Sequence, residues 1–115
     1  MRKYGNKKTI VDGFEFDSKL EAKRYNELKM LLRSGVITDL TLQKVFLLQD
    51  GFTYAKKRER PITYVCDFYY KDKQGSEIVE DAKGFKTDVY KIKRKLFLFK
   101  YPHVVFKEVI KWKLL

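Results

Sequence analysis

A single short hairpin can bring two aspartates of this chain together. Asp67 and Asp81 lie in two strand-like runs, and the segment 73–75 between the runs ends on Gly75. A three-residue loop with glycine in third place favours a hairpin, because that position takes a left-handed conformation that glycine adopts without steric cost. Closing the hairpin on this loop pairs Asp67 with Asp81 and places their Cβ atoms about 5 Å apart on one face of the sheet.

Two carboxylates opposed in this way repel each other, so positive charge is expected between them. Lys83 projects from the same face as Asp81, because the side chains of a strand repeat every second residue. Mg²⁺ is the other candidate, and Asp67, Asp81 and the carbonyl of Ala82 are its predicted oxygen ligands. The metal would polarise a phosphoryl oxygen and help to generate the attacking hydroxide. Lys83 would orient that water or stabilise the phosphate charge, so the predicted chemistry is phosphodiester hydrolysis.

Glu21 is a third acidic candidate, and it lies in a predicted helix. This helix begins at Asp17 or Ser18, and Ser18 with Glu21 fits a capping box. Glu21 lies at the inward end of the buried stripe, which is predicted to contain Tyr25, Leu28 and Leu32, with Leu31 alongside. Glu21 could reach the site directly or through a metal-bound water, or it could serve only the helix cap, and the two roles do not exclude each other.

The aspartates also have purely structural interpretations. Asp67 could be a surface charge on an edge strand, although its apolar neighbours indicate a mostly buried strand, where an unpaired carboxylate is costly. Asp81 and Lys83 could form a solvent-exposed pair on one strand face. Glu80 points to the opposite face from Asp81 and is treated as secondary, although its position next to Asp81 leaves the choice of acid open.

The composition indicates one small basic domain. The chain has 115 residues, a net charge of +11 and 16% aromatic residues. This length suits a single domain over residues 1–115, in which residues 1–8 form a flexible basic arm. The charge points to a polyanionic partner, with nucleic acid first, and the alternative is a soluble surface rich in lysine. The predicted nucleic-acid contacts are Lys56, Lys57, Arg58 and Arg60 in one segment and Lys91, Arg94 and Lys95 in another.

Several classes of function are disfavoured. The single cysteine, Cys66, allows no internal disulfide or thiolate cluster, and we expect it to be a small buried hydrophobe. His103 lacks a recognisable Ser or Cys partner, so a surface or structural role is preferred over a catalytic one. The sequence shows no secretory h-region and no apolar run near the ~20 residues that span a bilayer. We therefore expect a cytoplasmic protein with no membrane partner.

The predicted elements favour an α+β or mixed α/β domain, in which helices pack on a central mixed sheet. The first helix follows a small hairpin around Asp12-Gly13 and ends at Gly35. The second helix has Thr87 as N-cap, ends at Lys100, and is predicted to bury Val89, Ile92, Leu96 and Phe99 while exposing Lys91, Arg94 and Lys95. The other predicted elements are strands over 36–40 and 43–48 or one bent strand, a turn at Asp50-Gly51, a basic loop over 53–60, strands over 62–71 and 77–83, and a final strand over 103–112.

Four segments carry a resemblance to known proteins. They are 3–8 (KYGNKK), 16–22 (FDSKLEA), 62–68 (ITYVCDF) and 80–84 (EDAKG). An acid in a first helix, then an aspartate, then Asp-x-Lys on adjacent hairpin strands and a following helix, resembles the PD-(D/E)XK nuclease superfamily, which includes restriction endonucleases and Holliday-junction resolvases. Over nearly its whole length the chain is also similar to a family of small uncharacterised phage proteins from Gram-positive hosts.

The resemblance implies a restriction-endonuclease-like core and a Mg²⁺-dependent endodeoxyribonuclease, in which Mn²⁺ can substitute. By position, it assigns catalytic roles to Glu21, Asp67, Asp81 and Lys83, with Glu21 joining the metal ligands. Cys66 departs from the pattern, since it stands where the motif name has proline.

The predicted substrate is DNA with a particular structure. No base-reading motif is visible, so we expect a structure-selective nuclease of phage DNA processing or recombination, similar to a junction resolvase. A homodimer would let two sites cut two strands, and a phage-encoded chain would act in the host cytoplasm. Two alternatives remain, namely a non-catalytic nucleic-acid-binding module on a nuclease-like fold, and a small protein-interaction factor whose charge is incidental.

Overall fold

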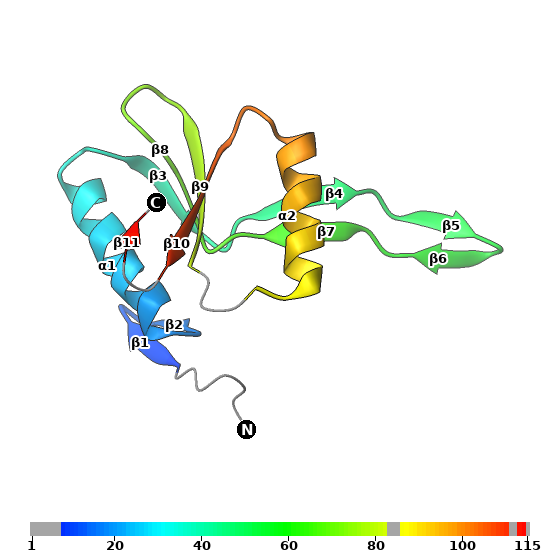
Figure 1. Cartoon of the computed structure of the whole chain (residues 1–115), viewed down its shortest axis with the longest axis horizontal. Coiled ribbons are helices and arrows are strands. Elements are labelled where there is room, and N and C mark those ends of the chain that lie inside the picture. Colours follow the sequence, from blue (N-terminus) through cyan, green and yellow to red (C-terminus); the bar gives the residue numbers. More distant parts are fainter. Residues whose placement is uncertain (1–7, 83–85, 111–112, 115) are drawn as a thin grey trace.

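A five-stranded mixed sheet lies between two helices in the computed structural model, which describes residues 8–82, 86–110 and 113–114 (Figure 1). Within these residues the helices are α1 (Lys19–Arg33) and α2 (Asp88–Lys100). The strand order is β11 (Lys113–Leu114), β10 (Val105–Ile110), β9 (Glu77–Ala82), β8 (Phe68–Lys71) and β3 (Thr38–Leu42). β9 and β10 are parallel, and the other neighbours are antiparallel. This arrangement confirms the predicted α+β class.

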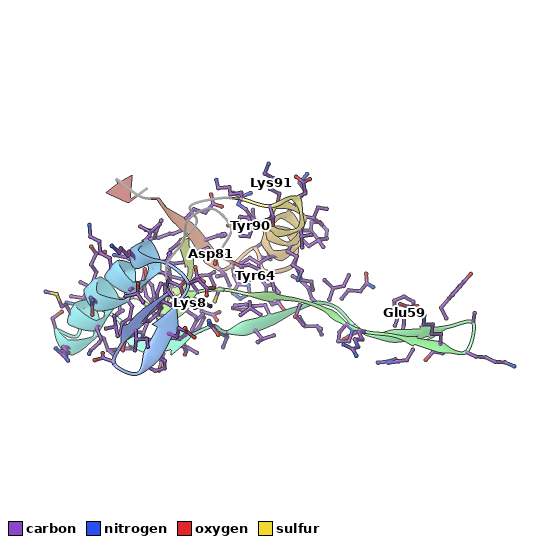
Figure 2. All side chains as sticks on the ribbon, turned by 90° about the horizontal axis from the view of Figure 1, so that it is seen from below. Lys8, Glu59, Tyr64, Asp81, Tyr90 and Lys91 are labelled. Atoms are coloured by element: carbon purple, nitrogen blue, oxygen red, sulfur yellow. The ribbon has the colours of Figure 1, made fainter. Side chains whose placement is uncertain are left out.

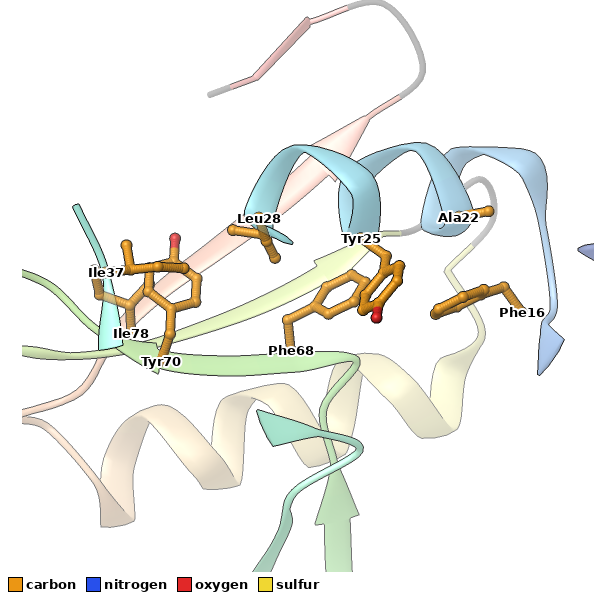
Figure 3. Packing of buried hydrophobic residues seen from close by; sticks show 8 residues of the cluster. All are labelled: Phe16, Ala22, Tyr25, Leu28, Ile37, Phe68, Tyr70 and Ile78. Atoms are coloured by element: carbon orange, nitrogen blue, oxygen red, sulfur yellow. The ribbon is translucent and has the colours of Figure 1, made fainter. Parts of the chain in front are cut away.

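Side chains of β8 and β9 alternate between two hydrophobic clusters, one beneath each helix. Phe68, Tyr70 and Ile78 pack with Tyr25 and Leu28 of α1 (Figure 3). The residues between them in sequence, Tyr69 and Val79, pack instead with α2, in a cluster that includes Phe97. Because successive side chains of a strand point to opposite faces, α1 and α2 cover opposite faces of the sheet. Glu80 and Asp81 are therefore directed to different layers.

The elements before the sheet follow local sequence signals. β1 (Thr9–Val11) and β2 (Phe14–Phe16) form the predicted hairpin, with Asp12 and Gly13 both at positive φ. Ser18 is the predicted N-cap of α1, and its hydroxyl accepts a hydrogen bond from the Glu21 N–H at 3.1 Å.

The predicted stripe of α1 is wrong at one position. Leu32 is 39% exposed, whereas Leu31 packs against the cluster beneath α1. The chain turns back after α1, with Gly35 in the left-handed region, and the Val36 N–H donates to the Leu31 carbonyl. This turn brings Ile37 into the same cluster, so Leu31 rather than Leu32 faces apolar side chains.

Residues 38–71 form one long bent ribbon made of three paired segments. β3 pairs with β8, β4 (Val45–Gln49) with β7 (Ile62–Val65), and β5 (Phe52–Tyr54) with β6 (Lys57–Glu59). Of the two predicted alternatives over 36–48, the two separate strands are found, as β3 and β4, which divide at Gln43-Lys44 and belong to different sheets. The predicted single strand over 62–71 is wrong, because it divides at Cys66-Asp67, where those two residues bond to the opposite bend.

The tip of this ribbon lies later in the sequence than predicted. The turn is at Ala55-Lys56, both at positive φ, and not at Asp50-Gly51. The basic segment predicted as a loop over 53–60 is instead most of a hairpin that projects away from the sheet and from α2 (Figure 1). Two consecutive left-handed residues match the twist of a two-residue hairpin turn, so the chain reverses there and passes from β4 to β5 through Asp50-Gly51 without reversing.

α2 begins at its predicted N-cap but buries a different face. Thr87 accepts a hydrogen bond from the Tyr90 N–H, and the buried residues are Tyr90 and Phe97. The four residues predicted to be buried are exposed by 42 to 88%, namely Val89, Ile92, Leu96 and Phe99. α2 carries two apolar faces, and the aromatic face is buried because Phe97 packs against the rings of Phe46 and Tyr64 from β4 and β7.

Three predictions fall partly or wholly outside the described residues. They concern the basic arm as far as residue 7, Lys83 at the end of its strand, and residues 111–112 of the final strand.

Candidate active site

The hairpin that carries the two aspartates closes as predicted. Gly75 has φ +82°, and the Asp72 N–H donates to the Ser76 carbonyl at 3.1 Å. Tyr70 pairs with Ile78, and two residues further along Phe68 pairs with Glu80. One more step on each strand brings the chain to Asp67 and Asp81.

Asp67 and Asp81 are held together by reciprocal hydrogen bonds. The Asp67 N–H donates to Asp81 Oδ1 at 3.2 Å, and the Ala82 N–H donates to Asp67 Oδ2 at 2.8 Å. The bend at Cys66-Asp67 makes this possible, since it lifts Asp67 out of the regular ladder and turns its N–H toward Asp81. Asp81 is fully buried, and Asp67 is partly exposed. The structure thus brings the two predicted acids together.

A second carboxylate group lies beside Asp81 on the neighbouring strand. Glu108 of β10 is in register with Asp81, so both side chains point to the α2 face. The Tyr90 hydroxyl donates to Glu108 Oε2 at 2.6 Å, and Lys86 Nζ lies 3.1 Å from Glu108 Oε1. Arg94 Nε lies 3.6 Å from Glu108 Oε2. Figure 2 shows Asp81 and Tyr90 between the sheet and α2.

The protonation states of this group follow from its contacts. The pKa of Tyr90 is raised, because burial, the hydrogen bond to Glu108 and the charges of Asp81 and Glu108 all disfavour a phenolate. Burial alone would raise the pKa of Glu108, but it is lowered, because the Tyr90 hydroxyl and the Lys86 ammonium stabilise its carboxylate. At neutral pH, Tyr90 is therefore a neutral donor and Glu108 an anion.

Glu80 belongs to a separate ion pair on the α1 face. Arg24 of α1 donates to it twice, from Nε to Oε1 at 2.7 Å and from Nη2 to Oε2 at 2.8 Å. The Tyr70 hydroxyl donates to the same carboxylate. Glu80 is completely buried and Arg24 nearly so. These contacts account for Glu80 as a structural residue, so the acid of the hairpin site is Asp81, with Glu80 on the opposite face as predicted.

Glu21 is buried at the start of α1, 5% exposed. Arg24 of α1 contacts Glu80 of β9. Glu21 lies one helical turn before Arg24, and one turn of a helix is about as long as two residues of a strand. Glu21 therefore lies at the level of Ala82, near the end of β9 that carries the aspartates. Among the described residues, however, no three His, Cys, Asp or Glu side chains gather closely enough to hold a metal ion. The structure does not join Glu21 to both aspartates in one cluster.

The donor set of the paired acids suits a hard cation. Asp67 and Asp81 offer carboxylate oxygens, and Ala82 adds a main-chain carbonyl. Mg²⁺ takes one or two protein carboxylates and keeps several waters, so it does not require a third acidic side chain. The pair therefore fits Mg²⁺ by the chemistry and closeness of its donors.

The predicted nucleic-acid contacts separate into three places. Lys56, Lys57, Arg58 and Arg60 are all exposed, at the tip, along β6 and just after it. Lys91 and Lys95 are exposed on α2. Arg94 points the other way, toward Glu108 and over the Phe106 ring at 5.3 Å. The prediction that Arg94 lies on the same exposed face as Lys91 and Lys95 is therefore wrong, because helical rotation turns it to the sheet side.

Cys66 and His103 take the roles that the sequence favoured. Cys66 is fully buried, and burial raises the pKa of its thiol to about 12. His103 is 62% exposed at its side chain, with Nε2 at 3.2 Å from Glu77 Oε2.

Arg24 and Glu108 are the polar residues that the sequence reasoning missed. Arg24 interrupts the apolar stripe of α1 between Glu21 and Leu28, and a cation at such a position signals a buried partner. Glu108 continues the alternation of Val104 and Phe106 on the inward face of β10. Its relation to Asp81 depends on the parallel register of β9 and β10, which lies outside local sequence signals.

These features define an α+β protein with a paired-carboxylate site on a hairpin, beside a buried tyrosine and further charged groups. Residues 1–114 match the model of the family described as "Protein of unknown function (DUF1064)", and the chain belongs to this family. No curated protein and no solved structure matches the chain. Neither described helix is long and apolar enough to cross a membrane.

Proposed function

We propose that the protein is a Mg²⁺-dependent endodeoxyribonuclease that acts on branched or otherwise structured DNA. The observation that carries this proposal is the reciprocal bonding of Asp67 and Asp81, which fixes two carboxylates side by side. Adjacent like charges are unfavourable, and a buried carboxylate is costly. A fold that holds such a pair in place is well suited to binding a divalent cation.

Asp67, Asp81 and the Ala82 carbonyl would hold the Mg²⁺ ion. When bound, Mg²⁺ supplies positive charge that polarises a phosphoryl oxygen. The reciprocal hydrogen bonds keep both carboxylates oriented before substrate arrives, which reduces the reorganisation needed on binding. Lys83, placed by the sequence on the same strand face as Asp81, would stabilise the negative charge that develops on the phosphate.

Glu108 and its partners would position cationic groups next to the paired acids. Glu108 accepts from Tyr90 and pairs with Lys86, so it fixes an ammonium beside the strand that carries Asp81. The Lys86 side chain is 42% exposed, which leaves it accessible to a DNA phosphate. We assign Tyr90 and Glu108 as positioning residues, because they act through Lys86 and the placement of β10.

Cleavage of supercoiled, linear and four-way-junction DNA in Mg²⁺ or Mn²⁺ tests the proposal. Asp67→Asn and Asp81→Asn keep an oxygen that can accept the main-chain hydrogen bond but lose the charge, and we expect each to abolish cutting. Asp72→Asn is the matched control, because Asp72 is a carboxylate at the loop end of the same hairpin, and an amide oxygen can still accept from the Gln74 and Ser76 N–H groups. Cutting that persists in both aspartate variants and in Lys83→Ala would remove the assignment.

A second candidate is a nucleic-acid-binding module that does not hydrolyse its ligand. The basic residues of the β5–β6 hairpin favour it, because they lie apart from Asp81 in the fold (Figure 2). Salt-dependent DNA binding, without cleavage and without calorimetric binding of Mg²⁺ or Mn²⁺, would support this candidate over the nuclease.

Cutting two strands of a junction calls for two sites, so we propose a homodimer on DNA. The place of action would be the bacterial cytoplasm, or that of the host if a phage encodes the chain. Sedimentation velocity with a four-way junction tests the stoichiometry, and a single copy on a junction that is cut on both strands would contradict it.

A further inference from the structure

The β5–β6 hairpin, residues 52–60, is an exposed arm without a hydrophobic core of its own. Its two strands pair only with each other among the described strands. Residues 52–58 are all exposed, and none belongs to either hydrophobic cluster. An isolated two-stranded hairpin is at best marginally stable in water. The side chains of the arm are therefore accessible to a binding partner.

The base of the arm is built for close approach of its two strands. A Cβ atom added to Gly51 would lie 2.9 Å from the Glu59 carbonyl oxygen and 2.6 Å from Arg58 Nη2. At the other end, Ala55 and Lys56 form the turn with φ values of 49° and 65°. The arm thus has a close contact between its strands at the base and left-handed turn residues at the tip.

The charge of the arm suits a polyanion. Four cationic side chains and one acidic side chain give residues 52–60 a net charge of +3, the cations being Lys56, Lys57, Arg58 and Arg60. Charge alone would serve the phosphates of any nucleic acid, duplex or single-stranded.

Two exposed aromatic rings lie on one face of the arm. Phe52 is opposite Glu59, and Tyr54 is opposite Lys57, so both rings share a face with Lys57 next to Tyr54 and Glu59 next to Phe52. Phe52 is 45% exposed and Tyr54 is 72% exposed. Their Cα atoms are about 7 Å apart, two residues along a strand, so each ring can receive its own base. Arg58, opposite Thr53, points from the other face.

An exposed aromatic face beside a cation is the arrangement that binds unpaired bases. In a duplex the flat faces of the bases are stacked on each other, whereas in a single strand they are available to aromatic rings. We propose that the β5–β6 arm binds unpaired bases through Phe52 and Tyr54, with Lys57 on the adjoining phosphate. Resting on the proposed nuclease function, this makes the substrate a DNA that contains single-stranded segments, such as a fork or flap.

Fluorescence anisotropy in EDTA tests the arm without cleavage. The probes are labelled DNA of three kinds, a single strand, a blunt duplex and a fork. We expect the double variant Phe52→Ala/Tyr54→Ala of the full chain to bind the single strand and the fork roughly ten- to hundredfold more weakly, with duplex binding changed less than about threefold. Thr53→Ala, on the same strand but the opposite face, should bind all three probes like the wild type.

A second measurement reports stacking itself. A fork carrying 2-aminopurine in its single strand should lose fluorescence on binding wild type and retain it with Tyr54→Ala, whereas Tyr54→Trp should restore the loss. Equal weakening on duplex and single strand would show that the arm binds phosphates only and would overturn the proposal. Unchanged single-strand affinity in the double variant would also overturn the proposal. If, in addition, the double variant lost binding to poly-glutamate, the arm would be a site for an acidic protein partner.

The outcomes separate the arm from the nuclease. Wild type that cuts no DNA, combined with the predicted loss of single-strand binding in the arm variant, would refute the nuclease and leave the arm as a binding site. Cleavage that depends on Asp67 and Asp81, combined with unchanged binding by the arm variant, would refute the arm alone.

Discussion

Replacing Arg24 by methionine should destabilise the fold strongly, because it leaves Glu80 charged and buried. Arg24 makes two hydrogen bonds to Glu80 at 2.7 and 2.8 Å, and the Glu80 side chain is completely inaccessible. After the substitution, the one side-chain donor left to this carboxylate within the described part of the chain is the Tyr70 hydroxyl. Removing one partner of a buried ion pair costs about 3–5 kcal/mol, which is a large part of the ~5–15 kcal/mol that stabilises a domain.

Urea unfolding followed by circular dichroism measures this loss. With a denaturant slope of about 2 kcal/mol/M, the midpoint of Arg24→Met should fall by roughly 1.5–2.5 M. Glu27→Gln is the matched control, because it removes the other partner of Arg24 in a pair that is 41% exposed at Glu27. A pair this exposed contributes about 0–1 kcal/mol, so the control midpoint should move little.

The double variant Arg24→Met/Glu80→Met separates the buried charge from lost packing. It should be more stable than Arg24→Met alone, because the isolated carboxylate is gone. If Arg24→Met unfolds at the same urea concentration as Glu27→Gln, Glu80 is not a structural partner of Arg24. The assignment of Glu80 to an ion pair separate from the hairpin site would then be wrong.

Three further predictions concern the rest of the structure. The pKa of Glu108 is lowered, so its contribution to stability is present above its ordinary pKa of 4.5 and is lost as pH falls through the lower folded value. Glu108→Gln should therefore lower the free energy of unfolding at pH 7, and lower it progressively less as the pH falls, in urea titrations at each pH. Gly51→Val should weaken fork binding in anisotropy while leaving the thermal midpoint nearly unchanged, since its added side chain would strike the Glu59 backbone at the base of the arm; a wild-type fork affinity would contradict this. Cys66, with a thiol pKa of about 12, should react with a disulfide reagent only on unfolding, so rapid labelling of the native protein would contradict its burial.

Local chemistry made the hairpin and the helix starts predictable. Gly75 selects a three-residue loop, and this loop alone fixes the register that brings Asp67 to Asp81. Ser18 and Thr87 supply capping oxygens within their own helical turns. Each of these signals acts over a few residues, so no knowledge of the tertiary structure is needed to apply it.

The failures involve choices that only tertiary packing makes. α2 has two apolar faces, and the one containing Phe97 is buried because β4 and β7 supply Phe46 and Tyr64 as ring partners. A helical periodicity cannot rank two faces when the partners are distant in sequence. Asp50-Gly51 has the composition of a turn, yet the ribbon passes through it and reverses at Ala55-Lys56.

The sequence predicted only part of the candidate site, because the rest depends on tertiary packing. The hairpin acids follow from local register, whereas Glu108 joins them only through the parallel pairing of β9 with β10. Arg24 and Glu80 are 56 residues apart in sequence, so their pairing requires the packing of α1 on the sheet.

A crystal structure of the protein soaked in Mn²⁺ would show whether a divalent cation binds at the paired aspartates. Anomalous scattering would locate the ion independently of any assumption about its ligands. We expect a single strong peak within coordination distance of Asp67 and Asp81, which disappears in Asp81→Asn. Well-ordered crystals of the wild type with no ion at these two carboxylates, at a Mn²⁺ concentration that supports DNA cleavage, would contradict it.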